Sequence, residues 1–168
     1  TSPYRLIGSR AELTAHTDFL PFVQKLRKGG YDGKGVQVIQ TASDFEKGFD
    51  APAVLEKFVD FEKELAVIVS RNVRGDVKSF PVVELEFNPE ANLVEFLFSP
   101  ANIPAVIEQK AQKIARDVIE KLGLVGVLAV ELFLTKTGEV LVNEIAPRPH
   151  NSGHQTIEAS YTSQYEQH

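Results

Sequence analysis

Two glutamates, Glu131 and Glu144, are the residues of this sequence with the clearest capacity for chemistry. They lie in two apolar segments, 124–134 and 140–145, whose composition and spacing predict a β-hairpin. If the hairpin brings the two carboxylates face to face among apolar neighbours, their repulsion must be relieved by a proton or a cation. A hard divalent cation that also binds phosphate oxygens meets this need. The pair therefore predicts a metal site.

The register of this hairpin decides whether the two carboxylates meet. A two-residue turn at Thr137-Gly138 would pair Lys136 with Glu139 and place Glu131 directly opposite Glu144, with Cβ atoms about 5 Å apart. Two alternatives stay open at this point. One glutamate points to solvent, or the register slips by one residue, which would send the two side chains to opposite faces of the sheet.

A glycine-rich segment, residues 25–35, is a second candidate site. It carries four basic residues (Lys25, Arg27, Lys28 and Lys34) against the single acid Asp32, and four glycines lie between them. Glycines let main-chain N–H groups approach an anion closely, and lysines add positive charge. The segment is therefore interpreted as a mobile loop that covers phosphates. The alternative is an ordinary hairpin loop whose lysines are solvated.

A polar loop follows the hairpin and brings more candidate groups close to Glu144. Residues 146–154 read APRPHNSGH, with Arg148, His150 and Asn151 stiffened by two prolines. An arginine fork binds small oxyanions, and histidine and asparagine donate hydrogen bonds to the same ligand. We favour a functional role over a plain surface loop. For His154, capping or packing at a helix start is favoured over chemistry.

Composition narrows the classes of protein. The chain has 168 residues, a net charge of −5, no cysteine and no methionine. The negative charge disfavours nucleic acid as a partner, and the lack of cysteine excludes disulfides and thiol catalysis. No apolar run is long enough for a membrane helix and no signal peptide is visible, so a cytoplasmic location is expected. The missing methionine and an unterminated final helix, expected over 157–168, suggest truncation at both ends.

The elements that must position these groups indicate an α+β fold with mostly antiparallel strands. Strands are expected at 22–26, 36–40, 54–59, 64–70, 78–85 and 93–98, besides the hairpin. Ser43 and Glu46 form a capping-box pattern that opens a short helix. A long helix starts at Pro104 and ends before Gly123. Its expected buried face consists of Ile107, Ala111, Ile114, Val118 and Leu122.

Several stretches together resemble one enzyme family. They are residues 25–35 (KLRKGGYDGKG), 56–64 (EKFVDFEKE), 123–133 (GLVGVLAVELF), 143–154 (NEIAPRPHNSGH) and 162–168 (TSQYEQH). They resemble the central ATP-grasp portion of the 5-(carboxyamino)imidazole ribonucleotide synthases. The resemblance implies an ADP-forming carbon–nitrogen ligase of de novo purine biosynthesis. ATP would phosphorylate bicarbonate to carboxyphosphate, which then carboxylates 5-aminoimidazole ribonucleotide.

The resemblance also implies a set of site residues by matching position. ATP would contact Lys25, the loop residues Gly30, Tyr31, Asp32, Gly33, Lys34, Gly35 and Val36, the hinge residues Glu56, Lys57, Phe58 and Val59, and also Glu64, Asn143 and Glu144. Glu131 and Glu144 would hold Mg²⁺ or Mn²⁺. Tyr31, Asp32 and Arg148 would bind the nucleotide substrate, and Arg148, His150 and Asn151 would act on bicarbonate or carboxyphosphate. From spacing alone, nothing favours a site at residues 56–59 over a sheet edge with a solvated ion pair.

The resemblance further implies an ATP-grasp fold in two parts. Residues 1–60 would form the lid subdomain, and residues 61–168 the larger subdomain with the metal-binding hairpin. The doubly wound N-terminal domain and the small C-terminal domain of the family are absent, so this chain alone is expected to be inactive or weakly active. A histidine that the family usually has near Phe87 is also absent. The full-length parent is expected to be a homodimer that binds small molecules only. The alternatives are another ATP-grasp carboxylase or ligase of purine synthesis, or a non-catalytic nucleotide-binding fragment.

Overall fold

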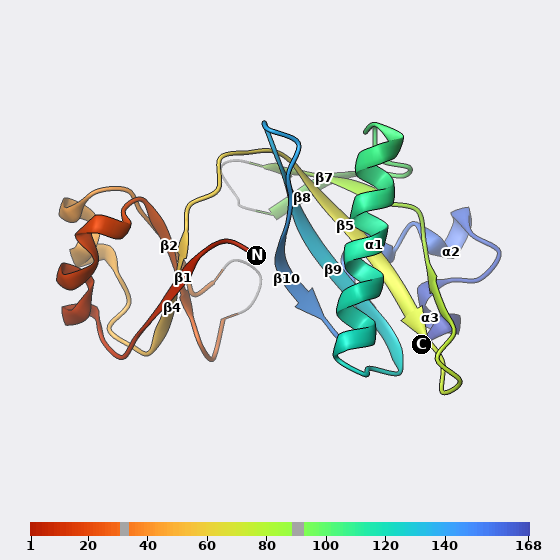
Figure 1. Cartoon of the computed structure of the whole chain (residues 1–168), viewed down its shortest axis with the longest axis horizontal. Coiled ribbons are helices and arrows are strands. Elements are labelled where there is room, and N and C mark those ends of the chain that lie inside the picture. Colours follow the sequence, from red (N-terminus) through yellow and green to blue (C-terminus); the bar gives the residue numbers. More distant parts are fainter. Residues whose placement is uncertain (31–33, 89–92) are drawn as a thin grey trace. The chain divides into compact units, whose positions relative to one another are not determined.

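Two antiparallel sheets, each with its own hydrophobic core, organise the chain (Figure 1). The computed structural model describes residues 1–30, 34–88 and 93–168. The chain divides into unit 1, Thr1–Val59, and unit 2, Asp60–His168. This boundary differs by one residue from the one drawn from the sequence.

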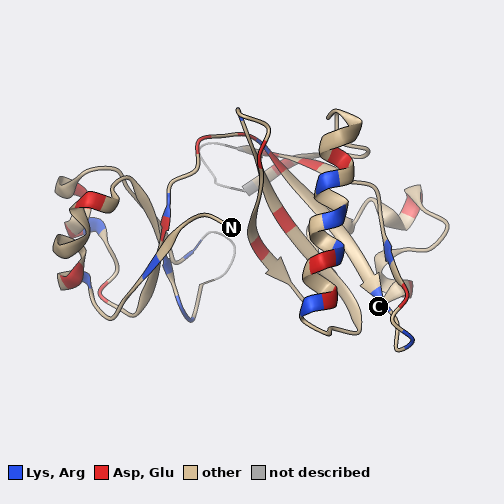
Figure 2. Ribbon diagram, viewed as in Figure 1, with Lys and Arg blue, Asp and Glu red and all other residues tan. Residues whose placement is uncertain are grey.

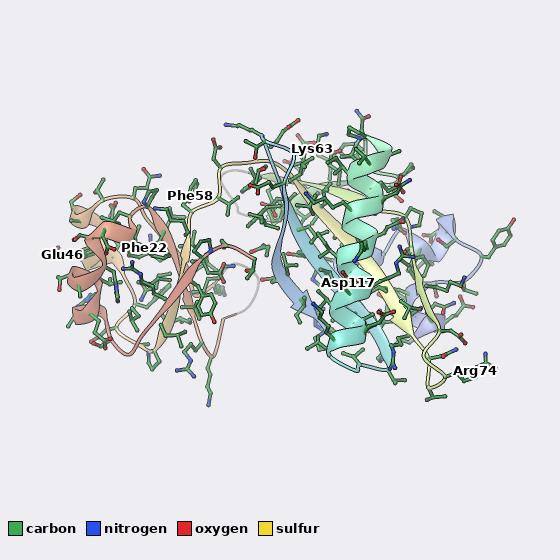
Figure 3. All side chains as sticks on the ribbon, viewed as in Figure 1. Phe22, Glu46, Phe58, Lys63, Arg74 and Asp117 are labelled. Carbon is green, nitrogen blue, oxygen red and sulfur yellow. The ribbon has the colours of Figure 1, made fainter. Side chains whose placement is uncertain are left out.

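Unit 1 is a four-stranded sheet covered on one face by two 3₁₀ helices. Its elements are β1 (Tyr4–Ile7), η1 (Arg10–Phe19), β2 (Phe22–Leu26), β3 (Val36–Ile39), η2 (Ala42–Lys47) and β4 (Ala53–Lys57), with the strand order β1-β4-β2-β3. Side chains alternate between the two faces, as the pleat requires. The inward set, which includes Phe22, Ile39 and Leu55, is fully buried and packs with Leu13 of η1. Figure 3 shows Phe22 between the sheet and the helices of unit 1.

The capping box of η2 lies two residues earlier than the sequence pattern indicated. Thr41, not Ser43, is the N-cap, and the Asp44 carboxylate accepts a hydrogen bond from the Thr41 N–H at 3.0 Å. Asp44 also pairs with Lys47 at 2.8 Å. The Lys47 hydrogen bond, followed by the one from Thr41, lowers the pKa of Asp44 to about 2. The expected short helix is present as a 3₁₀ helix.

Unit 2 is a sheet of six strands with one long helix. Its elements are β5 (Phe61–Arg71), β6 (Val77–Ser79), β7 (Val83–Asn88), β8 (Leu93–Phe98), α1 (Ala105–Lys121), β9 (Gly126–Thr135), β10 (Val140–Ala146), η3 (Asn151–Gly153), α2 (Thr156–Ala159) and α3 (Gln164–Gln167). The strand order is β10-β9-β5-β7-β8, and β6 pairs with β5. The expected strand at 78–85 is therefore two strands, because the chain leaves the sheet around Pro81, which has no N–H to donate.

Helix α1 buries its apolar stripe against one face of this sheet and crosses in front of it in Figure 1. Ala111, Ala115 and Ile119 are fully buried, whereas Leu122 is 55% exposed, so the buried stripe lies slightly to one side of the expected one. Pro104 is the N-cap, and Gly123 follows the C-cap with a φ of +61°. This glycine ends the helix as predicted, since the left-handed region favours a residue without Cβ.

The expected terminal helix at 157–168 is wrong. The chain forms two one-turn helices, α2 and α3, and Ser160 between them is extended with φ −132° and ψ 153°. Both η3 and α3 pack on the sheet, against β5 and β9 respectively. This placement brings Gln164 back to the loop that follows β10.

Candidate functional site

The β9–β10 hairpin reaches the expected pairing of glutamates by a different route. Thr135, not Lys136, faces Glu139: its N–H donates to the Glu139 carbonyl at 2.9 Å, and the Gly138 N–H donates back to the Thr135 carbonyl at 2.9 Å. The loop therefore holds three residues, with Gly138 at φ +80° in the left-handed position that such loops need. The predicted two-residue turn is wrong.

A β-bulge then restores the register. Val142 lies opposite Leu132, and after the extra residue Asn143 the next pair is Glu144 opposite Glu131. Without the bulge, Asn143 would face Glu131 and Glu144 would point to the other side of the sheet. The expected pairing of the two carboxylates is thus confirmed, and Figure 2 shows the acidic bands on the adjoining strands β9 and β10.

Glu131, Glu144 and His150 converge on one point of unit 2. Their ligand atoms all lie within 4.8 Å of one another. The Glu131 side chain is 14% exposed and the His150 side chain 9%, and their nearest atoms, Oε1 and Nε2, are 3.6 Å apart. Glu144 is exposed. Two carboxylates of this kind fit a hard divalent cation, because oxygen ligands are what Mg²⁺ and Mn²⁺ prefer.

These side chains lie on the face of the sheet opposite α1. Glu131 faces Ala66 of β5, whereas its neighbours Val130 and Leu132 belong to the core under α1. Glu64, two residues from Ala66 along β5, points to the same face as Glu131. Three of the four glutamates predicted to bind metal or nucleotide, Glu64, Glu131 and Glu144, therefore share one face of unit 2.

Arg148 and Asn151 flank His150 in the loop after β10. Arg148 is exposed, and its Nη1 donates to the Pro149 carbonyl at 3.0 Å, which uses one of the five N–H donors of the guanidinium. The Asn151 Oδ1 accepts from the Ser152 N–H at 2.9 Å. Both side chains thus sit beside the carboxylate pair in the sequence and at the solvent side of the loop. His154 stacks on Tyr165 with ring centroids 6.5 Å apart, in line with the packing role favoured above.

Unit 1 holds the other predicted contacts on its open face. The face of the sheet opposite η1 and η2 carries Tyr4, Leu6, Val23, Lys25, Val36, Val38, Val54 and Glu56. Within this face the Lys25 Nζ lies 2.9 Å from the Glu56 Oε2, and both side chains are about one-fifth exposed. An apolar surface with one cation and one anion at its centre suits a flat ring that bears polar edges and a charged tail.

The hinge segment already uses part of its main chain. The N–H groups of Lys57 and Phe58 donate to the carbonyls of Pro3 and Pro21 at 2.8 and 3.2 Å. The Lys57 ammonium donates to the Leu20 carbonyl at 2.7 Å. If residues 56–59 contact a nucleobase as predicted, other groups of this segment must make those contacts.

The glycine-rich loop is described at its two ends. Gly30, Lys34, Gly35 and Val36 lie where the loop joins β2 and β3, and the Leu26 N–H donates to the Gly35 carbonyl at 2.9 Å. Gly35 has a φ of +85°, and a Cβ there would press on Leu26. The predicted contacts of Tyr31, Asp32 and Gly33, and the predicted mobility of the loop over them, fall outside the described residues.

Two buried residues that support His150 were missed by sequence reasoning. Ser152 and Gln164 are both fully buried and bond to the ring and to the main chain of His150. Gln164 lies fourteen positions away, so no local spacing signals its contact. The only sequence indication is that it falls in a stretch, 162–168, included in the family resemblance.

The sequence profile of the ATP-grasp domain matches residues 1–165. The chain belongs to the ATP-grasp family. The predicted α+β class with antiparallel sheets is confirmed. Among curated relatives, the N5-carboxyaminoimidazole ribonucleotide synthase of Bacillus subtilis (strain 168) is 44% identical over 174 residues, covering 99% of this chain and 45% of the relative. The synthase of the same name from Synechococcus elongatus is 42% identical, covering 95% and 40%.

Solved structures of enzymes with similar names also match this chain. The ADP complex of an N5-carboxyaminoimidazole ribonucleotide synthetase matches with a TM-score of 0.92 at 44% identity, over 100% of this chain and 46% of that one. The Aspergillus clavatus synthase complexed with ATP matches with a TM-score of 0.93 at 33% identity, over 100% and 46%. A structure of the fungal synthase with ADP and 5-aminoimidazole ribonucleotide matches with a TM-score of 0.89 at 32% identity, over 100% of this chain and 45% of that one. The chain spans about half the length of these relatives.

Proposed function

We propose that this chain is the ATP-grasp part of an N5-carboxyaminoimidazole ribonucleotide synthase. The proposed reaction uses ATP and bicarbonate to carboxylate 5-aminoimidazole ribonucleotide in purine biosynthesis. The observation that carries the proposal is the pair of facing carboxylates, Glu131 and Glu144, beside His150 in a chain 44% identical to a synthase of that name.

Each unit contributes its own residues to the proposed reaction. In unit 2, Glu131 and Glu144 would hold Mg²⁺ or Mn²⁺, which when bound neutralises phosphate charge during phosphoryl transfer. Glu64 would bind the ribose hydroxyls on the same face. In unit 1, Lys25 would contact the phosphates, with Glu56 holding its ammonium in place at 2.9 Å. The hinge, residues 56–59, would contact the base.

The loop after β10 would handle the small substrates. Arg148 would bind bicarbonate or carboxyphosphate through its guanidinium fork and also contact the ribonucleotide, and Asn151 would donate from its amide. Carboxyphosphate decomposes readily in water, so a loop that closes over the site is expected, and residues 30–36 are proposed for that role.

The proposal also covers the oligomeric state and the cellular location of the full-length protein. A homodimer in the cytoplasm is proposed, and the mass of the purified protein in solution tests the dimer. No helix among the described residues is long and apolar enough to cross a membrane. One relative, the phosphoribosylaminoimidazole carboxylase of Vigna aconitifolia, is chloroplastic by its name.

The decisive test measures ADP release by the protein that contains this chain. We expect release only when bicarbonate and aminoimidazole ribonucleotide are supplied together with ATP and Mg²⁺. Glu144→Gln should lower kcat about 100-fold or more, because it removes one of two charged metal ligands. Glu139→Gln, an exposed change in the same hairpin, is the matched control and should leave kcat unchanged.

Other outcomes separate the alternatives. ADP release that needs a different amine acceptor would assign the chain to another ATP-grasp ligase. If the full-length protein binds Mg²⁺-ATP but shows no turnover, the alternative of a non-catalytic nucleotide-binding chain is supported. Near-normal activity of Glu144→Gln would show that this carboxylate holds no essential metal.

A further inference from the structure

His150 is clamped by its main chain to a distant residue. The Gln164 Oε1 accepts from the His150 N–H at 2.9 Å, and the Gln164 Nε2 donates to the His150 carbonyl at 2.8 Å. Gln164 is itself held, since its N–H donates to the Thr156 hydroxyl at 2.9 Å. A Cβ on Gly153 would collide with the Gln164 carboxamide, so the glycine makes room for this clamp.

The imidazole of His150 is oriented by Ser152. The Ser152 Oγ lies 2.9 Å from the His150 Nδ1, and the Ser152 N–H also points at Nδ1 at 3.4 Å while bonding more closely to Asn151. An N–H aimed at Nδ1 requires a lone pair on that nitrogen, so in the neutral ring Nδ1 accepts and Ser152 donates. The proton of the neutral ring then resides on Nε2.

The Nε2 atom of His150 faces the carboxylate pair and lies 3.6 Å from the Glu131 Oε1. A proton on Nε2 is therefore directed toward the side of the ring where the carboxylates lie and where an oxygen-bearing ligand beside them would lie. A ring that bound the metal through Nε2 would need the opposite tautomer, with Nδ1–H donating to Ser152.

We propose that Ser152 and Gln164 are positioning residues that hold His150 as an Nε2–H hydrogen-bond donor beside Glu131 and Glu144, and not as a ligand to the metal. The nature of the acceptor rests on the proposed function: it would be an anionic oxygen of phosphorylated bicarbonate, close to where charge develops during phosphoryl transfer. The orientation of the ring itself does not depend on that function.

A second buried glutamine, Gln24, makes the same kind of main-chain clamp at a position where no site residue is predicted. In unit 1 the fully buried Gln24 makes the same two bonds to the main chain of Phe49, at 2.8 and 2.9 Å. Such a clamp is therefore a general device for fixing a loop. What sets His150 apart is the ring that the clamp delivers to the carboxylates, and Gln24 provides a matched control for Gln164.

The ring tautomer is tested by ¹⁵N NMR of the imidazole nitrogens in this chain. His150→Asn identifies the signals, and the pH is kept high enough for the ring to be neutral. We expect protonated Nε2 and unprotonated Nδ1, and we expect Nε2 to keep its proton when Mg²⁺ is added. Protonated Nδ1 in the wild-type chain, or loss of the Nε2 proton on adding Mg²⁺, would overturn the proposal. If Mg²⁺ shifts no signal of Glu131 or Glu144, the metal site of the proposed function fails, while the tautomer still decides the present inference.

Variants separate positioning from plain stability. Ser152→Ala should give a mixture of tautomers, whereas Ser163→Ala, which removes a hydroxyl that caps α3, should not. In the full-length enzyme, Gln164→Met should lower kcat about 10-fold or more while KM for ATP changes little. Gln24→Met removes an equivalent clamp and should leave kcat of the folded enzyme unchanged. Equal kcat losses for the two glutamine variants would contradict a positioning role.

Discussion

The facing carboxylates Glu131 and Glu144 are expected to lower the stability of the sheet. Like charges opposite each other on neighbouring strands destabilise a sheet, typically by about 0.2–1 kcal/mol. Glu131 is largely buried while Glu144 is exposed, so solvent screens part of this repulsion. Under the proposed function, the pair is explained by the cation that it would bind rather than by what it adds to the fold.

The repulsion predicts that Glu144→Gln has opposite effects on the free energy of unfolding with and without divalent metal. Without divalent cations, Glu144→Gln should raise the free energy of unfolding by about 0.5 kcal/mol, because it removes the repulsion. With saturating Mg²⁺ the wild type should become the more stable of the two, because binding to the folded state adds stability. Chemical denaturation at neutral pH with EDTA or with Mg²⁺ measures both values.

The control for this prediction is Glu139→Gln, which removes the same charge at the exposed end of the hairpin. It should change the free energy of unfolding little, and equally with and without Mg²⁺. A Glu144→Gln variant that is less stable than wild type in EDTA would contradict a net repulsion between the two carboxylates.

Sequence reasoning identified the candidate site residues but not the buried residues that contact them. Glu131, Glu144 and His150 stood out because carboxylates within apolar strands and a histidine in a proline-stiffened loop are unusual in themselves. Ser152 and Gln164 did not, since serine and glutamine are common surface residues. Their burial depends on tertiary packing, which no local pattern encodes.

At the scale of elements, the hairpin was predicted correctly for a reason that was partly wrong. The two-residue turn was off by one residue, and the bulge at Asn143 shifted the strand back by one. Alternating apolar residues reveal which segments are strands, but a bulge adds a residue without disturbing composition. The pairing of Glu131 with Glu144 therefore holds, although the register near the turn differs by one.

The bulge allows the spacing role of Asn143 to be separated from any contact by its side chain. Deleting Asn143 joins Val142 directly to Glu144, and a regular ladder would then still place Glu144 opposite Glu131. We expect the deletion variant to bind Mn²⁺ within a few-fold of wild type, by electron paramagnetic resonance of the free ion. Asn143→Ala, which keeps the bulge, is the matched variant.

Two outcomes would contradict this account of the bulge. If the deletion abolishes Mn²⁺ binding while Asn143→Ala retains it, the bent backbone itself shapes the metal site. If both variants lose binding, the Asn143 side chain takes part in holding the ion.

The terminal segment shows tertiary contacts overriding local propensity. Residues 157–168 lack glycine and proline and so favour a continuous helix. The break at Ser160 instead lets Gln164 and Thr156 meet, with a 2.9 Å bond between them, under the loop that carries His150. A straight helix would carry Gln164 about 12 Å along its axis from Thr156, at 1.5 Å per residue.

At the scale of the whole molecule, the chain holds separate cores. Phe22 belongs to a core cluster of residues from unit 1, whereas Ile119 and the stripe of α1 belong to a cluster of residues from unit 2. The sequence indicated the α+β class because strand-like and helical periodicities are local properties, whereas the division near residue 60 was implied by the family resemblance. It did not reveal which face of each sheet is covered, since that depends on the path of η1, η2 and α1.

Separate cores predict that one unit can be loosened without the other. Phe22→Ala should cost about 3–5 kcal/mol, which is comparable with the whole stability of a unit as small as Thr1–Val59. Amide hydrogen exchange should then lose protection in β2 and β4, while β5 and β9 stay protected. Val38→Ala, on the open face of the same sheet and already 38% exposed, should change little. Equal loss of protection in all four strands would show that the chain unfolds as a single cooperative body, in which the two cores support each other.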